Sequence, residues 1–291
     1  MTLRLDFLTK IFKNQFTFNP LRYFSYNKNV QSMHNYGFAE EKCMEIRLIS
    51  GGGRLRECKR ILESALAGKD GKILILPIPT TRDNIFINST AITVKSVADM
   101  LDEDTLVVGY GIPGDIIDGA EQAGARVFDA SLDEEFLIAN AKISANGALG
   151  YILTHSIKDM GDMKIGIVGY GRIGREMTRL CLLFGADVRL YTAREGTAIE
   201  LCEMGIDARL IDENSDFSDL DVLVNTTPKR QIADRKIPKE IEIIDLASGS
   251  IFEPSERLIK LSSIPEAFYP KTAGRLYAEA VLRFLGKEGR I

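Results

Sequence analysis

The sequence predicts an α/β protein with two doubly wound domains, each a parallel sheet with helices on both faces. Two observations predict this fold class. From residue 44 onward, short β-branched runs alternate with amphipathic helical stretches. A glycine-rich turn at residues 169–174 follows one such run and opens a helix. The 291 residues are enough for two domains with a sizeable core.

The first domain is expected over residues 44–133 and is predicted to be flavodoxin-like. Its predicted strands are Ile46–Ser50, Lys72–Leu76, Thr105–Val108 and Ala125–Asp129, and its predicted helices are Leu55–Leu66, Ser96–Leu101 and Gly114–Gln122. A linker helix, Glu134–Ile157, is predicted within residues 134–160. The Ser-Ala-Asn-Gly step at residues 144–147 favours a break in this helix.

The second domain is expected over residues 161–270. Ile165, Ile167 and Val168 form a buried-strand pattern, and the helix after the glycine turn ends at Gly185. Further strands are predicted from Val188, at Ala208–Ile211, Val222–Val224 and Ile241–Asp245, and near Ser262–Ser263. A closing amphipathic helix, Thr272–Leu285 within residues 271–291, is expected to return across the interface between the domains.

Residues 1–43 differ from the rest of the chain. They are rich in Phe, Tyr, Asn and Lys and show no clear period, and they lack the continuous apolar core of a secretory signal. We expect a disordered extension, with the folded protein starting near Met44.

The composition limits the function classes. The net charge of −4 gives no reason to expect nucleic acid, and no apolar run is long enough for a membrane span. The pattern of the cysteines favours a cytoplasmic protein, in which thiols stay reduced. Two histidines exclude a His-rich metal site. The cysteines show no metal-binding spacing and are expected to be reduced, mostly buried thiols: Cys43, Cys58, Cys181 and Cys202. No metal is therefore predicted.

The glycine turn predicts a dinucleotide site. In GxGxxG, Gly169 permits the tight turn, Gly171 lets the backbone approach a pyrophosphate, and Gly174 allows close packing of helix and strand. Arg172 and Ile173 open the helix, whose free N–H groups and dipole suit a diphosphate. A glycine turn without a ligand is the alternative.

The end of the next strand bears on the choice between NADP and NAD. The position usually held by Asp or Glu falls on Thr192 or Ala193, and Arg194 follows. Arginine can pair with a 2′-phosphate, so NADP is favoured. NAD stays open, because Glu195 could serve the 2′-hydroxyl if the strand runs longer.

Three more residues are predicted to contact the cofactor because they follow strands at their carboxyl ends, where ligands bind in doubly wound sheets. They are Thr226, Pro228 and Ser248.

Two α/β domains with the glycine motif in the second resemble the NAD(P)-linked formate and D-2-hydroxyacid dehydrogenase superfamily. The closing segment YPKTAGRLYAEA, residues 269–280, has Lys271 where those enzymes carry their acid/base His. The run IDLASGS, residues 244–250, lacks their substrate-binding Arg. An ordinary hydroxyacid dehydrogenase is therefore disfavoured.

The chain more closely resembles the dipicolinate synthase A-subunit family over residues 44–287. The stretches that carry the likeness are DEEFLIANAKISANGAL (133–149), GYGRIG (169–174), PKTAGRLYAEAVLRFL (270–285) and GGGRLRE (51–57). Asn146 replaces the usual Glu of the first stretch, and Gly53 stands where Asp is usual in the last.

The resemblance implies an NADP-linked oxidoreductase that converts dihydrodipicolinate to dipicolinate in the mother-cell cytoplasm during sporulation, with a smaller, flavoprotein-like B-subunit. Two alternatives stay open. One is a dehydrogenase of another small carboxylic acid. The other is a nucleotide-binding subunit without catalysis, in line with the departures at Gly53 and Asn146. Formation of a homo-oligomer is also left open.

Candidate substrate groups are placed by their expected nearness to the interdomain cleft. Lys271 is the candidate acid/base or carboxylate ligand, and Arg275 lies one turn on. Arg54 follows the glycines of residues 51–53, which suggest an anion nest. The other candidates are Arg82 in a loop and Asn140, Ser144 and Asn146 on the linker helix. The alternative for each is an ordinary surface or helix-capping residue.

Overall fold

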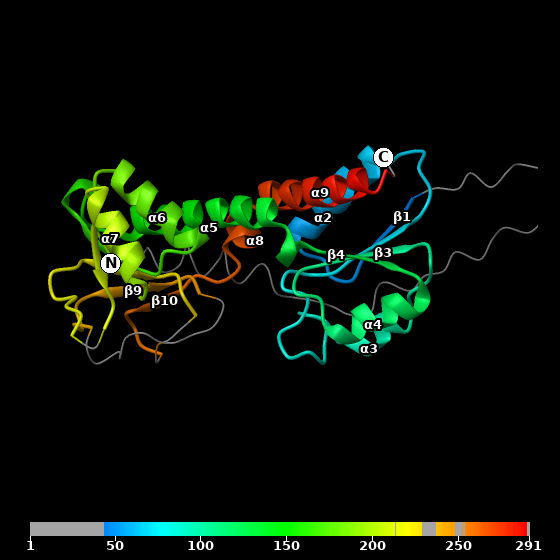
Figure 1. The fold of residues 1–291 in the computed structure, drawn as a ribbon, viewed down its shortest axis with the longest axis horizontal. Coiled ribbons are helices and arrows are strands. Elements are labelled where there is room, and N and C mark those ends of the chain that lie inside the picture. Colours follow the sequence, from blue (N-terminus) through cyan, green and yellow to red (C-terminus); the bar gives the residue numbers. More distant parts are fainter. Residues whose placement is uncertain (1–43, 213, 229–236, 248–251, 253, 290–291) are drawn as a thin grey trace, which may run out of the picture. The chain divides into compact units, whose positions relative to one another are not determined.

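The structure is a computed structural model that describes residues 44–212, 214–228, 237–247, 252 and 254–289. Two parallel sheets form its framework, one of four strands and one of six (Figure 1). The predicted fold class, two parallel α/β sheets with a closing helix, is confirmed. The predicted extension, residues 1–43, and Ser248 lie outside the described residues.

The first sheet has its strands in chain order, β1-β2-β3-β4. Its elements are β1 Glu45–Leu48, α2 Gly53–Ala65, β2 Lys72–Ile75, α3 Val94–Ala98, β3 Thr105–Gly109, α4 Gly114–Ala123 and β4 Arg126–Asp129. Alternate side chains of β2 enter different cores: Ile73 and Ile75 pack with α2, whereas Leu74 packs with α3 and α4. The two inner strands, β2 and β3, are therefore buried on both faces, as their continuous apolar pattern requires.

The connections of this sheet have opposite hands. The steps from β1 to β2 and from β2 to β3 run in the same direction across the sheet, yet α2 covers one face and α3 the other (Figure 1). One of the two crossovers is therefore left-handed, against the strong right-handed preference. The strand order also departs from the 2-1-3-4-5 order of flavodoxin-like sheets.

The second sheet has the order β10-β9-β8-β5-β6-β7. This is the 3-2-1-4-5-6 order of Rossmann folds, with the switch point between β5 and β8. Its elements are β5 Lys164–Val168, α6 Arg172–Leu183, β6 Asp187–Thr192, α7 Glu195–Glu203, β7 Asp207–Leu210, β8 Val222–Asn225, β9 Glu242–Asp245 and β10 Leu258–Lys260.

The last strand was predicted in the wrong place. It is Leu258–Lys260, where Leu258 and Ile259 pair with Ile243 and Ile244 of β9. Ser262 and Ser263 instead lead into the short helix α8, Ile264–Phe268, with Ser263 in the left-handed region at φ 54°. Helices α7 and α8 are additions to the predicted elements.

The linker helix α5, Glu134–His155, is continuous, so the predicted break at residues 144–147 is wrong. Gly147 has a packing role instead. A Cβ on it would lie 2.2 Å from Cγ2 of Ile264, so the glycine allows α8 to pack closely on α5. The helix ends two residues before the predicted Ile157.

The closing helix α9, Pro270–Lys287, packs along α2 of the first sheet, as predicted (Figure 1). A Cβ on Gly274 would lie 2.5 Å from the carbonyl oxygen of Arg54, which shows how closely the two helices approach. Tyr277 of α9 is fully buried at this contact. The centre of its ring lies 5.5 Å from the centre of the Phe136 ring of α5.

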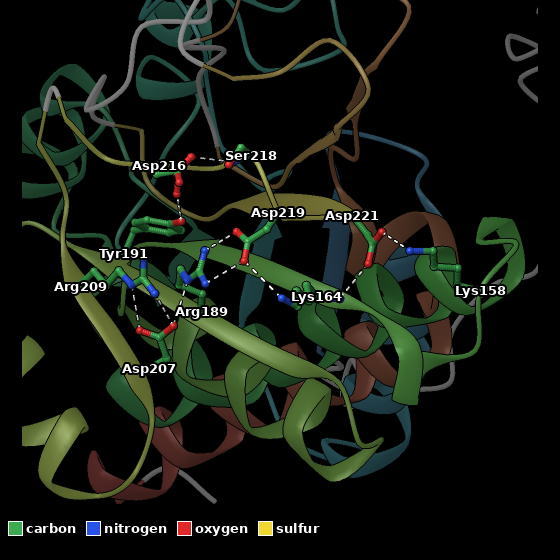
Figure 2. A network of polar contacts seen from close by, with 10 residues as sticks. All are labelled: Lys158, Lys164, Arg189, Tyr191, Asp207, Arg209, Asp216, Ser218, Asp219 and Asp221. Atoms are coloured by element: carbon green, nitrogen blue, oxygen red, sulfur yellow. Dashed lines mark hydrogen bonds and ion pairs between the residues drawn. The ribbon is translucent and has the colours of Figure 1, made fainter.

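An ion-pair network ties the strands of the second sheet together (Figure 2). Arg189 on β6 bonds to Asp207 on β7 at 2.9 Å and to Asp219 at 2.5 Å. Lys164 on β5 lies 3.3 Å from the same Asp219 carboxylate. The hydrogen bond with Arg189 is the main cause that holds the pKa of Asp219 well below its usual range. The network supports the register of β5 and β6, which carry the candidate site.

Candidate cofactor and substrate sites

The turn between β5 and α6 has two packed glycines and one open glycine. Gly169 lies at φ +94°, in the left-handed region that favours glycine. A Cβ on Gly174 would lie 2.1 Å from the carbonyl oxygen of Gly169, so no side chain fits there. Gly171, the N-cap of α6, would place a Cβ with nothing within 4 Å. The backbone is therefore open to a ligand at the second glycine and closed at the other two.

Thr226, at the carboxyl end of β8, supports this turn from behind. Its hydroxyl donates a hydrogen bond to the carbonyl oxygen of Val168 at 2.8 Å. It would also lie 2.8 Å from a Cβ on Gly169. Thr226 therefore positions the turn. Pro228 is exposed after the same strand.

A hollow of about 530 Å³ lies in front of the turn. It is lined by Glu134, Ile138, Lys142, Tyr170, Gly171, Arg172, Arg175, Glu176 and Arg194. Four of these side chains are cationic and two are acidic, so the hollow carries net positive charge. Because the N-terminus of α6 also opens here, it has the chemistry of a phosphate site.

Predicted cofactor residues meet in this hollow. Arg172 comes from the first turn of α6, and Arg194 is the N-cap of α7. Thr192 is buried at the end of β6, and its hydroxyl accepts the backbone N–H of Arg194 at 3.2 Å. Ile173 follows Arg172 on α6 and packs against the core of the second sheet. Glu195 is the first residue of α7.

Six of the lining residues were not predicted from the sequence as site residues: Glu134, Ile138, Lys142, Tyr170, Arg175 and Glu176. Arg175 lies one turn after Arg172 on α6, with its guanidinium carbon 5.2 Å from the ring centre of Tyr170. Tyr170 sits inside the glycine motif itself. The helical spacing from Arg172 to Arg175 could have signalled the second arginine. Lys142 on α5 could not have been found, because only the packing of α5 on α6 brings it here.

Arg172 is already paired with the linker helix. Its Nε and Nη2 bond to the two carboxylate oxygens of Glu134 at 3.0 and 2.5 Å. This pair raises the pKa of Arg172 and lowers that of Glu134. A diphosphate bound at the turn would therefore lie beside the Arg172 guanidinium, whose orientation is fixed by Glu134 of α5.

Arg54 is the most deeply buried of the predicted substrate groups. It lies in the first turn of α2 with 5% of its surface exposed. Its buried Nε has no hydrogen-bond partner among the described residues and stands 3.9 Å from Oε2 of Glu266. Burial lowers the pKa of Arg54, while Glu266 opposes this shift.

The predicted anion nest at residues 51–53 is filled by the protein itself. Glu266 of α8 reaches it: Oε2 accepts the backbone N–H of Arg54 at 3.0 Å, and Oε1 would lie 2.8 Å from a Cβ on Gly52. Gly53 has no room for the Asp that is usual there, because a Cβ would lie 2.9 Å from Cβ of Pro270. The nest is therefore a helix cap, a correction to the expectation from the glycines alone.

The other predicted cations lie on the surface. Lys271 and Arg275 are exposed on α9, and Arg275 pairs with Glu279 at 2.6 Å on the same helix. The pKa of Glu57 on α2 is lowered mainly by Arg60, with a contribution from Lys271. Arg82 is exposed in its loop, with Nε 3.3 Å from Oδ1 of Asn88.

The predicted polar groups of α5 have mixed surroundings. Ser144 is buried, and its hydroxyl donates to the carbonyl oxygen of Asn140 at 2.9 Å, so its proton is used within the helix. Asn140 is half-buried and Asn146 is exposed. None of the three stands out as a ligand for an anion in this arrangement.

Within the part of the chain that the structure describes, no group of three or more His, Cys, Asp or Glu could hold a metal ion. Burial raises the pKa of Cys58 and of Cys181 to about 12, so both are thiols at neutral pH. Cys202 is exposed. None of the described helices combines the length and apolar character needed to cross a bilayer.

One family model matches part of the chain, from the linker helix through most of the second domain. Residues 142–251 match the family model described as D-isomer specific 2-hydroxyacid dehydrogenase, NAD binding domain. The strand order and the glycine turn agree with this match. The second domain thus has the Rossmann fold of an NAD(P)-binding domain, which implies a nicotinamide cofactor. By sequence, the chain matches none of the curated proteins.

Solved structures show the same fold over most of the chain. The A chain of dipicolinate synthase from Bacillus subtilis aligns with a TM-score of 0.69 at 17% identity, covering 85% of this chain and 96% of that one. The A-subunit of dipicolinate synthase from Bacillus halodurans gives 0.68 at 20% identity, covering 84% and 97%. A transhydrogenase from Sinorhizobium meliloti gives 0.55 at 13% identity, covering 84% and 92%. The resemblance to the A-subunit of dipicolinate synthase is confirmed at the level of the fold.

Proposed function

We propose that this protein is an NADP-linked oxidoreductase similar to the A-subunit of dipicolinate synthase, and that it dehydrogenates dihydrodipicolinate to dipicolinate. The observation that carries the proposal is the open Gly171 at the start of α6, facing a hollow with four cationic side chains. The likeness of the whole fold to two dipicolinate synthase structures supports the choice of reaction.

The residues around the turn fit the cofactor. Gly171 and the N-terminus of α6 would hold the diphosphate, with Arg172 and Arg175 beside it. Arg194, after the end of β6, would pair with a 2′-phosphate, which favours NADP over NAD. The bound nicotinamide would supply a hydride acceptor.

Aromatising a dihydropyridine ring also needs a base for the departing proton and cations for two carboxylates. Lys271, at the start of α9, is our candidate for the base, on the strength of its place in the closing segment. Arg54, Arg82 and Arg275 are the candidate carboxylate ligands, with Asn140, Ser144 and Asn146 as polar candidates on α5. We further propose a smaller, flavoprotein-like partner protein, and action in the mother-cell cytoplasm.

A second candidate function is a dehydrogenase of another small carboxylic acid. The match of residues 142–251 to the 2-hydroxyacid dehydrogenase NAD-binding domain favours it. Lys271 in place of a histidine, and Leu246 and Ala247 without an arginine beside them, weigh against its common form.

The test is calorimetric titration of the full chain with NADPH and with NADH. We expect NADPH to bind more tightly. Arg194→Ala should weaken NADPH binding by about tenfold or more, since a charge-assisted pair is lost, and leave NADH nearly unchanged. The matched control is Arg209→Ala, which removes an exposed cation from β7 of the same sheet, where Arg209 pairs with Asp207.

The outcomes separate the claims. Binding of neither nucleotide would remove the basis for an oxidoreductase. Equal losses for NADPH and NADH in Arg194→Ala would reject the 2′-phosphate assignment. If NADPH binds as expected, turnover of dihydrodipicolinate, with and without the flavoprotein-like partner, decides between the two candidate reactions.

A further inference from the structure

Arg54 carries a buried charge that the protein pairs only in part. The residue is 5% exposed, and its Nε is buried without a hydrogen-bond partner among the described residues. The guanidinium makes no hydrogen bond to any residue that the structure describes. The nearest carboxylate, Glu266, stands 3.9 Å from Nε and already accepts the backbone N–H of Arg54.

Burying the Arg54 guanidinium in this way lowers the stability of the fold, which is unusual for a residue with only a structural role. Arginine stays protonated, so burial cannot be relieved by loss of the proton. A buried charge without full hydrogen bonding costs several kcal/mol in general, and cores usually avoid it. Glu266 is itself about one-third exposed, so it compensates Arg54 weakly. Within the described part of the chain, the guanidinium lacks a second acceptor.

The neighbouring groups cannot supply that acceptor as an anion. Tyr277 of α9 is fully buried, and its hydroxyl likewise has no hydrogen-bond partner among the described residues. Burial raises the pKa of Tyr277 well above its usual value, so the hydroxyl keeps its proton. Cys58 is a neutral thiol for the same reason. The position therefore offers two unused donors, one cationic and one neutral.

We infer that Arg54 and Tyr277 together form the anchor for one carboxylate of the substrate. A guanidinium presents its donors in a planar fork that matches the two oxygens of a carboxylate, and a phenol hydroxyl can add a third hydrogen bond. The two residues belong to the same close contact of α2 and α9: Gly274, one turn before Tyr277 on α9, would place a Cβ 2.5 Å from the carbonyl oxygen of Arg54. The assignment of this carboxylate to a substrate rests on the proposed function.

Glu266 has a positioning role in this inference. Its carboxylate caps α2 at the backbone N–H of Arg54. The same carboxylate lies on the Nε side of the Arg54 guanidinium. The other donors of the fork are left for the ligand. Because Glu266 belongs to α8, which packs on α5, it also links the first turn of α2 to the second sheet.

The experiment combines stability with ligand binding on the full chain. The variants are Arg54→Met, which removes the charge at similar volume, and Tyr277→Phe, which removes only the hydroxyl. The control is Arg60→Gln, an exposed arginine on the same helix that pairs with Glu57. Each protein is heated alone, and each is titrated with pyridine-2,6-dicarboxylate in metal-free buffer, since this probe chelates divalent cations. NADPH is titrated in parallel.

We expect Arg54→Met to melt at the same or a higher temperature than the parent, because an incompletely paired buried charge is removed. Its affinity for the dicarboxylate should fall by about 30-fold or more. Tyr277→Phe should weaken binding of the dicarboxylate by about threefold to tenfold, because one neutral hydrogen bond is lost. Arg60→Gln should bind like the parent, and all variants should keep NADPH binding.

A marked loss of melting temperature in Arg54→Met, with unchanged dicarboxylate affinity, would overturn the inference and make Arg54 a structural residue. A parent that binds NADPH but not the dicarboxylate would also overturn it. By contrast, a parent that binds the dicarboxylate through Arg54 but neither nucleotide would leave the anchor intact and reject the proposed function.

Discussion

The carboxylate of Glu266 accepts a hydrogen bond from the backbone N–H of Arg54 at 3.0 Å, across 212 positions of the chain. The N-cap of α2, Gly52, has no side chain to satisfy the first N–H groups of the helix. Glu266 therefore does what a local Ser or Asp does in other helices, and its charge suits the helix dipole.

Replacing Glu266 by Gln should lower the free energy of unfolding by about 1–2 kcal/mol, because the cap weakens and Arg54 loses its nearest carboxylate. Urea denaturation measures this loss. Glu279→Gln, which affects an exposed pair on α9, is the control and should cost less than about 0.5 kcal/mol. In the Arg54→Met background the effect of Glu266→Gln should shrink. Equal effects of Glu266→Gln and Glu279→Gln would contradict the capping role.

The two glycines Gly171 and Gly174 should respond differently to alanine. Gly174→Ala forces a methyl group against the carbonyl oxygen of Gly169 and should cost about 1–3 kcal/mol of stability. Gly171 has an ordinary extended backbone and open space, so Gly171→Ala should leave stability nearly unchanged. It should still weaken nucleotide binding by about tenfold, because the methyl group occupies the approach of the diphosphate. Thermal melting and calorimetry on both variants decide the matter. Normal nucleotide affinity in Gly171→Ala would place the diphosphate elsewhere.

The network around Asp219 predicts a pH dependence of stability. Its pKa in the folded protein lies below the usual 3.8, first because of Arg189. A carboxyl with a lowered pKa stabilises the fold above its unfolded pKa and loses this contribution as the pH falls through the folded pKa. Asp219→Asn should therefore destabilise the fold at pH 7, by about 1 kcal/mol given the partial exposure of Asp219, and the difference from the parent should shrink progressively as the pH falls below about 3.8 toward the lower folded pKa.

Melting of parent and variant between pH 7 and pH 2 measures this difference. Asp187→Asn is the matched control on β6, because Asp187 is exposed and makes no ion pair among the described residues. High salt should reduce the Asp219 effect. If the stability difference between the parent and Asp219→Asn grew toward low pH, the stabilising role of the Asp219 carboxylate would be rejected.

Local patterns were enough to predict the cofactor turn. The glycines, the apolar strand before them and the amphipathic helix after them are close in sequence. The need for glycine at positions 169 and 174 could therefore be predicted without knowledge of the tertiary structure. Arg194 was found in the same way, because the Rossmann pattern fixes which residue ends the next strand. The long closing helix and its return across the interface between the domains were predicted from its amphipathic period and length, whereas its packing along α2 came from the structure.

The sequence by itself thus determined the fold class, the glycine turn and the class of its cofactor, since each depends on spacing along a short stretch. The tertiary structure alone decided that Lys142 joins the cofactor hollow, that Glu266 fills the nest before Arg54, and that Tyr277 lies buried near that arginine. It also decided the strand order of the first sheet. The physical reason is the same in each case: these features depend on the packing of helices far apart in sequence, which no local pattern encodes.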